Sequence, residues 1–242
     1  KKVLLIDADA QANLTMALGY NRPDDIPITL STVMQNIIDD KTLDVSQGII
    51  HHSEGVDLLP SNIEMSGFEV RLINAMSRER VLKTYVNEVK KNYDYVLIDC
   101  MPSLGMITIN ALAAADSVII PTQPHYLSAK GLELLLRSVS MVKRQINPKL
   151  RIDGILMTMV MPRTNISKEI TATVKSAYGK KIKVFDTEIP HSIRAVEATA
   201  EGKSIFAYDK SGKVAAAYEQ LGKEVAEIGE KQRNQNRADR IR

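Results

Sequence analysis

The feature of this sequence that most constrains its fold is an alternation of short apolar runs with longer segments of helical periodicity. Such alternation is typical of βαβ units, and it predicts an α/β fold with a mostly parallel sheet. The expected strands are Val3–Asp7, Val56–Pro60, Tyr95–Asp99, Ser117–Thr122, Ile152–Val160 and Val184–Pro190. The expected helices are Leu30–Asp39, Ile63–Ala75, Arg80–Lys91, Met106–Ala114, Lys130–Gln145, Ser167–Tyr178, Ile193–Ala200 and Val214–Glu230.

Composition narrows the class of protein. The chain has 242 residues, which suits one large α/β domain or at most two small ones, and its 44% hydrophobic and 25% charged residues exclude wholesale disorder. No apolar run reaches the length of about 18 residues that a membrane-spanning helix needs. The single cysteine, Cys100, excludes a disulfide scaffold and a multi-cysteine metal site. Because the sequence has no secretory-signal pattern either, we expect a cytoplasmic protein.

The positive charge is concentrated at the end of the chain. The last twelve residues carry five Lys and Arg against one Asp, whereas the whole chain has a formal net charge of +3. The body is therefore close to neutral, and any contact with a polyanion must come from local patches or from the tail. We expect one domain over residues 1–230, followed by a basic polar tail over residues 231–242 that is a frayed helix end or disordered.

Carboxylates follow two of the expected strands directly. Asp7 and Asp9 end the first strand, and Asp99 ends the strand that begins at Tyr95. In open parallel sheets, ligands bind beyond the carboxyl ends of the strands. Nucleotide hydrolases hold Mg²⁺ with an aspartate at such a position, often through a water molecule. A single aspartate there more often caps the next helix, but two such strands favour a magnesium and phosphate site.

A phosphate-binding loop of the form G-x-x-x-x-G-K-[ST] does not occur in the 242 residues. Gly-Lys pairs stand at positions 179–180, 202–203, 212–213 and 222–223, and none has a glycine five positions earlier.

Three segments resemble one protein family. The run KKVLLIDADAQANLT resembles the K-x-V-L-L-I-D-x-D-P-Q-G-N-x-T segment of the ParA/Soj family of partition ATPases. The run YDYVLIDCMPSLGMITINALAAADSVIIPTQPHYLSAKGLELL is similar to the Walker B and switch II region of that family. The run TEIPHSIRAVEATAEGKSI is similar to its late I-P-R-N-x-R-x-x-E-A-x-x-x-G-K-x-I segment. The matches stand in the family's order and span residues 1 to about 225.

The resemblance implies a P-loop-type α/β ATPase, built on a doubly wound, mostly parallel sheet, that uses ATP and Mg²⁺. Asp9 matches the switch I aspartate that orients or polarises the attacking water. Asp99 matches the Walker B aspartate that holds Mg²⁺ through water, and Asp7 is expected to support the site from behind. Pro190 and Ser192 match the segment that packs on the adenine ring, although the family more often has Asn where Ser192 stands.

The resemblance also implies a role in partitioning plasmid, chromosome or mobile-element DNA. Members of the family dimerise on ATP, bind DNA nonspecifically and respond to a ParB-like centromere-binding protein, so a cytoplasmic, nucleoid-associated protein is expected. Arg163 matches one DNA-contact region, and His191 and Arg194 match a second. The family often has Arg at the position of His191, and a histidine there predicts weaker or pH-dependent DNA contact.

The sequence departs from the family pattern in one respect, and two alternative functions remain open. The family carries a lysine-rich phosphate loop, K-G-G-x-G-K-T, about thirty residues ahead of the first matching segment. We therefore expect this sequence to be part of a longer protein, or a gene fragment without tight ATP binding.

One alternative function is a MinD-like regulator of cell division at the membrane surface; another is a noncatalytic remnant that only dimerises or binds a partner. The alanine-rich segment Val214–Glu230 lacks the bulky apolar face of a membrane-binding helix, so we expect no membrane contact.

Overall fold

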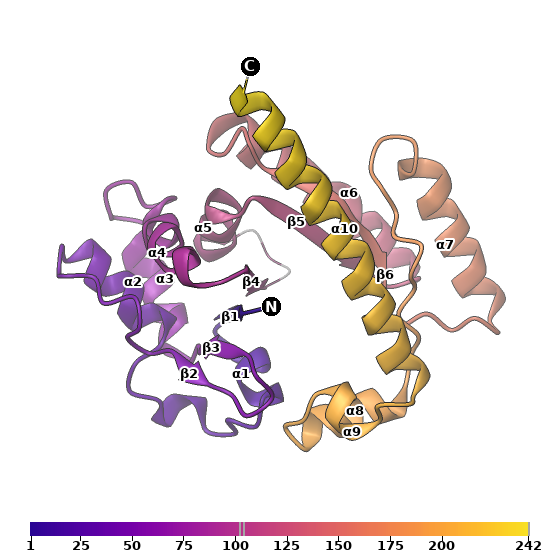
Figure 1. The fold of residues 1–242 in the computed structure, drawn as a ribbon, viewed down its shortest axis with the longest axis horizontal. Coiled ribbons are helices and arrows are strands. Elements are labelled where there is room, and N and C mark those ends of the chain that lie inside the picture. The colour runs from indigo at the N-terminus through magenta and orange to yellow at the C-terminus, as the bar shows by residue number, and fades with distance from the viewer. Residues whose placement is uncertain (102, 104, 242) are drawn as a thin grey trace. The chain divides into compact units, whose positions relative to one another are not determined.

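The chain forms two compact units, which are described separately (Figure 1). The structure is a computed structural model that describes residues 1–101, 103 and 105–241. The first unit comprises Lys1–Asp116, Leu135–Leu150 and Thr199–Ser204. The second comprises Ser117–Leu134, Arg151–Ala198 and the chain from Ile205 onward.

The first unit contains a four-stranded sheet with the strand order β2–β3–β1–β4. β1 pairs in parallel with both β3 and β4, and β2 is antiparallel to β3. The bounds are β1 Val3–Ala8, β2 Ile50–His51, β3 Asp57–Leu59 and β4 Tyr95–Cys100. Within the described part of the chain β4 is an edge strand, and its Leu97 is 52% exposed.

Helices of the first unit pack against the buried side chains of this sheet. Leu4 and Ile6 of β1 are fully buried and share a core with Phe68 and Tyr85 of two helices. The helices are α1 Asn13–Ala17, α2 Leu30–Ile38, α3 Glu64–Leu72, α4 Val81–Val89 and α5 Met106–Ala114, with short 3₁₀ turns at Pro23–Asp25 and Lys90–Asn92. α2 begins after Thr29 because Thr29 and Thr32 form a reciprocal capping box. α6, Tyr126–Gln145, contributes residues to both units.

The second unit is built on a two-stranded parallel sheet. β5, Ser117–Thr122, pairs with β6, Arg151–Met157. The helices are α7 Asn165–Tyr178, α8 Ile193–Ala200, α9 Ile205–Tyr208 and α10 Lys213–Ile241. One face of α10 packs on a core around Phe185, and the residues of this face recur at helical spacing: Ala217, Leu221, Val225 and Ile228.

Some of the observed strands and helices have the bounds predicted from the sequence, and others differ. The strand Ser117–Thr122 and the helices Met106–Ala114 and Ile193–Ala200 have the predicted bounds. The strand predicted over Val184–Pro190 is wrong, since this segment makes only two isolated parallel bridges, Ile155 with Val184 and Val160 with Pro190. β6 ends at Met157 instead of Val160, because Met159 takes a left-handed backbone conformation with φ of 52°.

The end of the chain differs in part from the expectation. α10 runs without interruption from Lys213 to Ile241, so the backbone of the basic tail is helical. Within the described residues, no helix combines the length and the apolar character that crossing a bilayer would need.

Candidate functional site

Carboxylates meet at one edge of the sheet in the first unit. Asp7 of β1 stands opposite Asp99 of β4 in the parallel register, and Asp9 follows Asp7 by two residues. Burial raises the pKa of Asp99, and the negative charges of Asp7 and Asp9 raise it further. Although the surrounding protein desolvates its carboxyl group in this way, the residue Asp99 as a whole keeps solvent-exposed surface. The structure therefore brings the three predicted carboxylates together at this edge of the sheet.

Asp7 holds the loop after β1 in place. Its carboxylate is fully buried and accepts three hydrogen bonds, from the backbone N–H of Asp9 (3.1 Å) and from the backbone N–H (2.9 Å) and hydroxyl (2.7 Å) of Thr15. Burial raises the pKa of Asp7, and the hydrogen bonds from Thr15 and Asp9 oppose this effect. The Thr15 hydroxyl also accepts a hydrogen bond from the Ser61 backbone N–H at 3.2 Å, which ties the loop to the chain after β3. The Asp7 carboxylate is therefore enclosed by the loop that it holds, with both of its oxygens hydrogen-bonded.

Asp9 is presented by a tight turn. Its Oδ1 accepts a hydrogen bond from the Gln11 backbone N–H at 2.9 Å, and its carbonyl accepts one from Ala12 at 3.0 Å. Ala12 takes the left-handed conformation with φ of 53° and starts α1. The side chain of Asp9 is half-buried, in contrast to the fully buried Asp7. Asp9 and Asp99 are therefore the two carboxylates of the group that are open to a ligand.

The donor set fits Mg²⁺ bound together with a phosphate group. Among the described residues, no three His, Cys, Asp or Glu side chains form a cage for a metal ion. Mg²⁺ does not need one, because it is usually held by one or two carboxylates and keeps several water and phosphate oxygens as ligands. Asp99 and Asp9 supply hard oxygen atoms at the edge of the sheet where α/β proteins bind ligands.

The remaining predicted residues lie together in the second unit. The backbone N–H of Val160 donates to the Ile189 carbonyl, and that of His191 donates to the Val160 carbonyl, both at 3.0 Å. This pairing places the turn that carries Arg163 beside Pro190 and the residues that follow it, Ser192 and Arg194 among them. Arg163, His191 and Arg194 are all exposed, and the Arg194 Nε lies 3.6 Å from Asp209 Oδ2.

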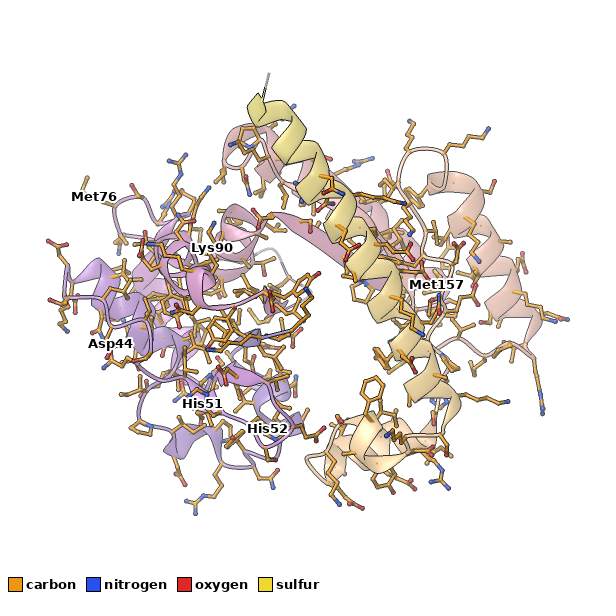
Figure 2. All side chains as sticks on the ribbon, viewed as in Figure 1. Asp44, His51, His52, Met76, Lys90 and Met157 are labelled. Atoms are coloured by element: carbon orange, nitrogen blue, oxygen red, sulfur yellow. The ribbon has the colours of Figure 1, made fainter. Side chains whose placement is uncertain are left out.

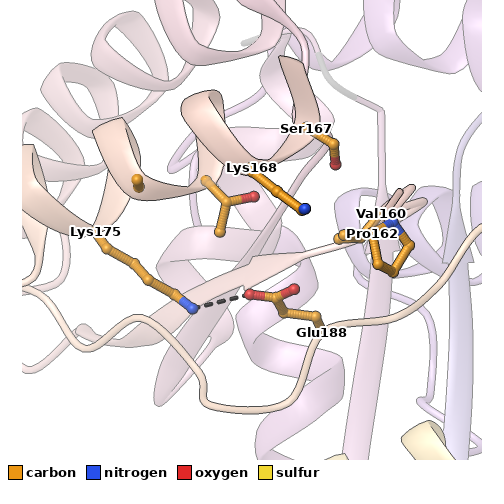
Figure 3. Close-up of a pocket in the computed structure, with 8 residues that line it drawn as sticks. Val160, Pro162, Ser167, Lys168, Lys175 and Glu188 are labelled. Carbon is orange, nitrogen blue, oxygen red and sulfur yellow. Dashed lines mark hydrogen bonds and ion pairs between the residues drawn. The ribbon is translucent and has the colours of Figure 1, made fainter. Parts of the chain in front are cut away.

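A cavity of about 310 Å³ opens in the same unit between α7 and the strand-like segments (Figure 3). Lys175 and Glu188 form an ion pair of 2.8 Å across it, and Lys168 and Thr171 also line it. The Thr171 hydroxyl is buried without a hydrogen-bond partner in the structure.

The sequence reasoning missed one polar network in the first unit. The His51 Nδ1 lies 2.5 Å from Asp57 Oδ1, and the Tyr93 hydroxyl donates to the other oxygen of Asp57 at 2.6 Å. His51 is the last residue of β2 (Figure 2). Asp57 is 9% exposed, whereas the His51 side chain is 81% exposed. The signal was the hairpin between β2 and β3, in whose antiparallel register His51 and Asp57 are direct partners.

Comparison with known proteins places the chain in a family. A family model described as an AAA domain matches residues 1–152. The chain is 40% identical over 230 residues to the sporulation initiation inhibitor protein Soj of Bacillus subtilis, which covers 95% of this chain and 88% of that protein. It is 36% identical over 227 residues to the chromosome partitioning protein ParA of Myxococcus xanthus, covering 93% and 77%.

A solved structure supports the same assignment. Cobyrinic acid a,c-diamide synthase from Mycobacterium smegmatis, with a bound ATP analogue and magnesium, is 33% identical to this chain. The similarity has a TM-score of 0.73 and covers 88% of this chain and 85% of that one. The predicted fold class is thereby confirmed: the chain has the α/β fold of P-loop nucleotide-binding proteins. Within that class, it belongs to the ParA/Soj family of ATPases.

Proposed function

We propose that this protein is an ATPase that partitions DNA, and that Asp9 and Asp99 are its working carboxylates. The observation that carries the proposal is the group of three acidic side chains at the ends of β1 and β4, where burial and then the charges of Asp7 and Asp9 raise the pKa of Asp99. A cation relieves such repulsion, and Mg²⁺·ATP supplies one with its own phosphate oxygens as further ligands. The relatives that bind an ATP analogue with magnesium, or are named for chromosome partitioning, support the same reading.

Each carboxylate has a separate role. Asp99 holds the water shell of the bound cation, and Asp9 orients the water that attacks the terminal phosphate. Asp7 keeps Asp9 in place through the hydrogen bond to its backbone N–H. Magnesium supplies charge neutralisation at the phosphates when it is bound. Pro190 and Ser192 pack against the adenine ring, and residues 1–230 act as one ATPase domain that ends in the basic tail of residues 231–242.

DNA contact is assigned to the exposed residues of the second unit. Arg163, His191 and Arg194 bind phosphates without reading bases, in a dimer that forms on ATP. A ParB-like centromere-binding protein stimulates hydrolysis, and the protein acts in the cytoplasm on the nucleoid. Because Arg194 forms an ion pair with Asp209, it contributes less to the affinity for DNA than Arg163 does.

The decisive experiment uses the whole natural polypeptide and compares Asp9→Ala with Asp44→Ala, an exposed aspartate whose carboxylate is hydrogen-bonded only locally, to Ser46. Asp9→Ala is expected to lower ATP turnover by about 10²-fold or more while leaving ATP-dependent dimerisation intact. Asp44→Ala is expected to match the wild type in both. Loss of dimerisation together with turnover would contradict the role assigned to Asp9, and wild-type protein without turnover would favour a noncatalytic remnant.

DNA binding has its own test. Arg163→Ala is expected to weaken ATP-dependent binding to random-sequence DNA and to reduce the slope of log affinity against log salt by about 1. Arg22→Ala, which removes an exposed arginine paired with Asp25 in the first unit, is the matched control. Equal binding with ATP, with ADP and without nucleotide would count against the partition role.

A further inference from the structure

A short segment from late in the chain is part of the first unit. Thr199–Ser204, here named the strap, belongs to this unit, although the residues immediately before and after it belong to the second. Two contacts hold the strap. Gly202 lies against Gly19, two residues after α1, and the Ser204 backbone N–H donates to Glu54 Oε1 at 2.9 Å. Hydrogen bonds from Ser204 lower the pKa of Glu54, consistent with a carboxylate held by the strap.

The contact between the two glycines is a direct meeting of backbones. A Cβ atom on Gly202 would lie 2.4 Å from the Cα and 2.8 Å from the nitrogen of Gly19. Real Cβ atoms essentially never come closer than 3.0 Å to such neighbours, so a side chain at position 202 must push Gly19 away. Gly202 also has φ of +64°, a conformation that glycine adopts without strain.

Gly19 is linked to Asp9 by a continuous series of backbone hydrogen bonds. Gly19 donates to Met16 at 2.9 Å, Met16 donates to Ala12 at 2.9 Å, and Ala12 donates to Asp9 at 3.0 Å. Backbone hydrogen bonds therefore connect the segment from Asp9 to Gly19 from one end to the other. Asp7 fixes its beginning through the backbone of Asp9, and Gly202 supports its end.

We propose that Gly202 is a positioning residue for Asp9, and that the strap sets where the Asp9 carboxylate stands during hydrolysis. The inference rests on the proposed role of Asp9. Widening the contact from 2.4 Å to an ordinary van der Waals distance moves Gly19 by about 1 Å, and a displacement of that size at a reacting group can lower a rate by about 10²-fold. The proposal therefore predicts an effect on kcat and none on the KM for ATP.

The test is the ATPase kinetics of Gly202→Ala in the whole natural polypeptide, with Gly55→Ala as control. Gly55 has φ of +83° and no neighbouring atom within 4 Å, so its alanine variant carries the left-handed strain without the clash. Gly202→Ala is expected to lower kcat by about 10- to 100-fold with KM for ATP unchanged, whereas Gly55→Ala keeps the wild-type kcat. Equal kcat values for the two variants would overturn the proposal.

A second variant covers the case in which Gly202→Ala does not fold. Glu54→Ala releases Ser204 without introducing a clash, and Glu88→Ala removes another exposed glutamate, one paired only with Lys91, as its control. Glu54→Ala is expected to lower kcat at constant KM, and Glu88→Ala is not. If Asp9→Ala abolishes turnover while Gly202→Ala and Glu54→Ala keep the wild-type kcat, the strap proposal alone is refuted. If Asp9→Ala retains turnover, both the strap proposal and the role of Asp9 are refuted.

Discussion

Thr15 offers the sharpest test of how the loop after β1 is held. Its side chain is fully buried, and its hydroxyl donates to Asp7 at 2.7 Å while accepting from the Ser61 backbone N–H at 3.2 Å. Thr15→Val keeps the shape of the side chain and removes both hydrogen bonds. The bond to the carboxylate is worth about 1.5–3 kcal/mol, and the buried Ser61 N–H that is left without an acceptor costs about 1–3 kcal/mol. The free energy of unfolding should therefore fall by about 3–5 kcal/mol.

The assay is equilibrium unfolding in urea, with two comparison variants. Thr15→Ser keeps the hydroxyl and loses one methyl group, so it should cost about 1 kcal/mol. Thr108→Val is a similar exchange in the same unit, but the Thr108 hydroxyl makes only a 3.5 Å contact with a carbonyl, so its cost should be below about 1 kcal/mol. Equal losses for Thr15→Val and Thr15→Ser would refute the reasoning.

The pH dependence adds a second readout for Thr15→Val. Burial raises the pKa of Asp7, and the hydrogen bonds from Thr15 lower it, so their loss should raise it further. The folded variant then binds a proton more readily than the folded wild type. Its deficit in the free energy of unfolding should therefore shrink as the pH falls through the native pKa of Asp7.

Three further predictions concern polar groups of the first unit. Burial acts to raise the pKa of Asp57, but hydrogen bonds from Tyr93 and His51 outweigh it and lower the pKa. Asp57→Asn should therefore lower the free energy of unfolding by about 1–3 kcal/mol at pH 7 in urea unfolding. This loss should disappear as the pH falls through the native pKa of Asp57, and a loss that stays constant with pH would contradict the reasoning. Burial and the charges of Asp7 and Asp9 raise the pKa of Asp99. Asp99→Asn should therefore increase the free energy of unfolding of the ligand-free protein at pH 7 by about 0.5–1 kcal/mol, a value reduced by solvent screening. The gain should vanish as the pH falls toward the ordinary aspartate pKa of about 3.9, and a loss of stability would count against mutual repulsion of the carboxylates. The buried Asn147 side chain donates to the carbonyls of Leu112 (3.0 Å) and Ala115 (2.8 Å), so Asn147→Leu should lower stability by about 2–4 kcal/mol in thermal unfolding, and an unchanged Tm would show that water replaces these bonds.

The clustering of Asp7, Asp9 and Asp99 at one edge of the sheet was predictable from the sequence, because it follows from simple rules. An apolar run such as Val3–Ile6 is typical of a strand in a parallel sheet, and the residues after it must emerge at the carboxyl edge. The same argument applied to Tyr95–Ile98 places Asp99 at that edge. Neither step requires knowledge of the long-range packing, and the parallel register of β1 with β4 does the rest.

Short elements and irregular segments were not predictable in this way. α1 has only five residues and starts at a left-handed Ala12, so it has no period that a sequence pattern could reveal. The apolar residues of Val184–Pro190 fit a strand, but β6 ends at Met157, and this segment makes only two isolated bridges, with Ile155 of β6 and with Val160 beyond it. The contact of Gly19 with Gly202 joins distant parts of the chain and depends on backbone shape alone, which gives no signal in either local sequence.

The most direct test of the central claim is the location of the bound cation. Crystals of the whole natural polypeptide with a nonhydrolysable ATP analogue and Mn²⁺ in place of Mg²⁺ would show the ion by its anomalous scattering. The account predicts an anomalous peak at the ends of β1 and β4, held by Asp99 through water, with Asp9 beside the terminal phosphate. A peak away from this edge of the sheet, with neither carboxylate near the nucleotide, would contradict it.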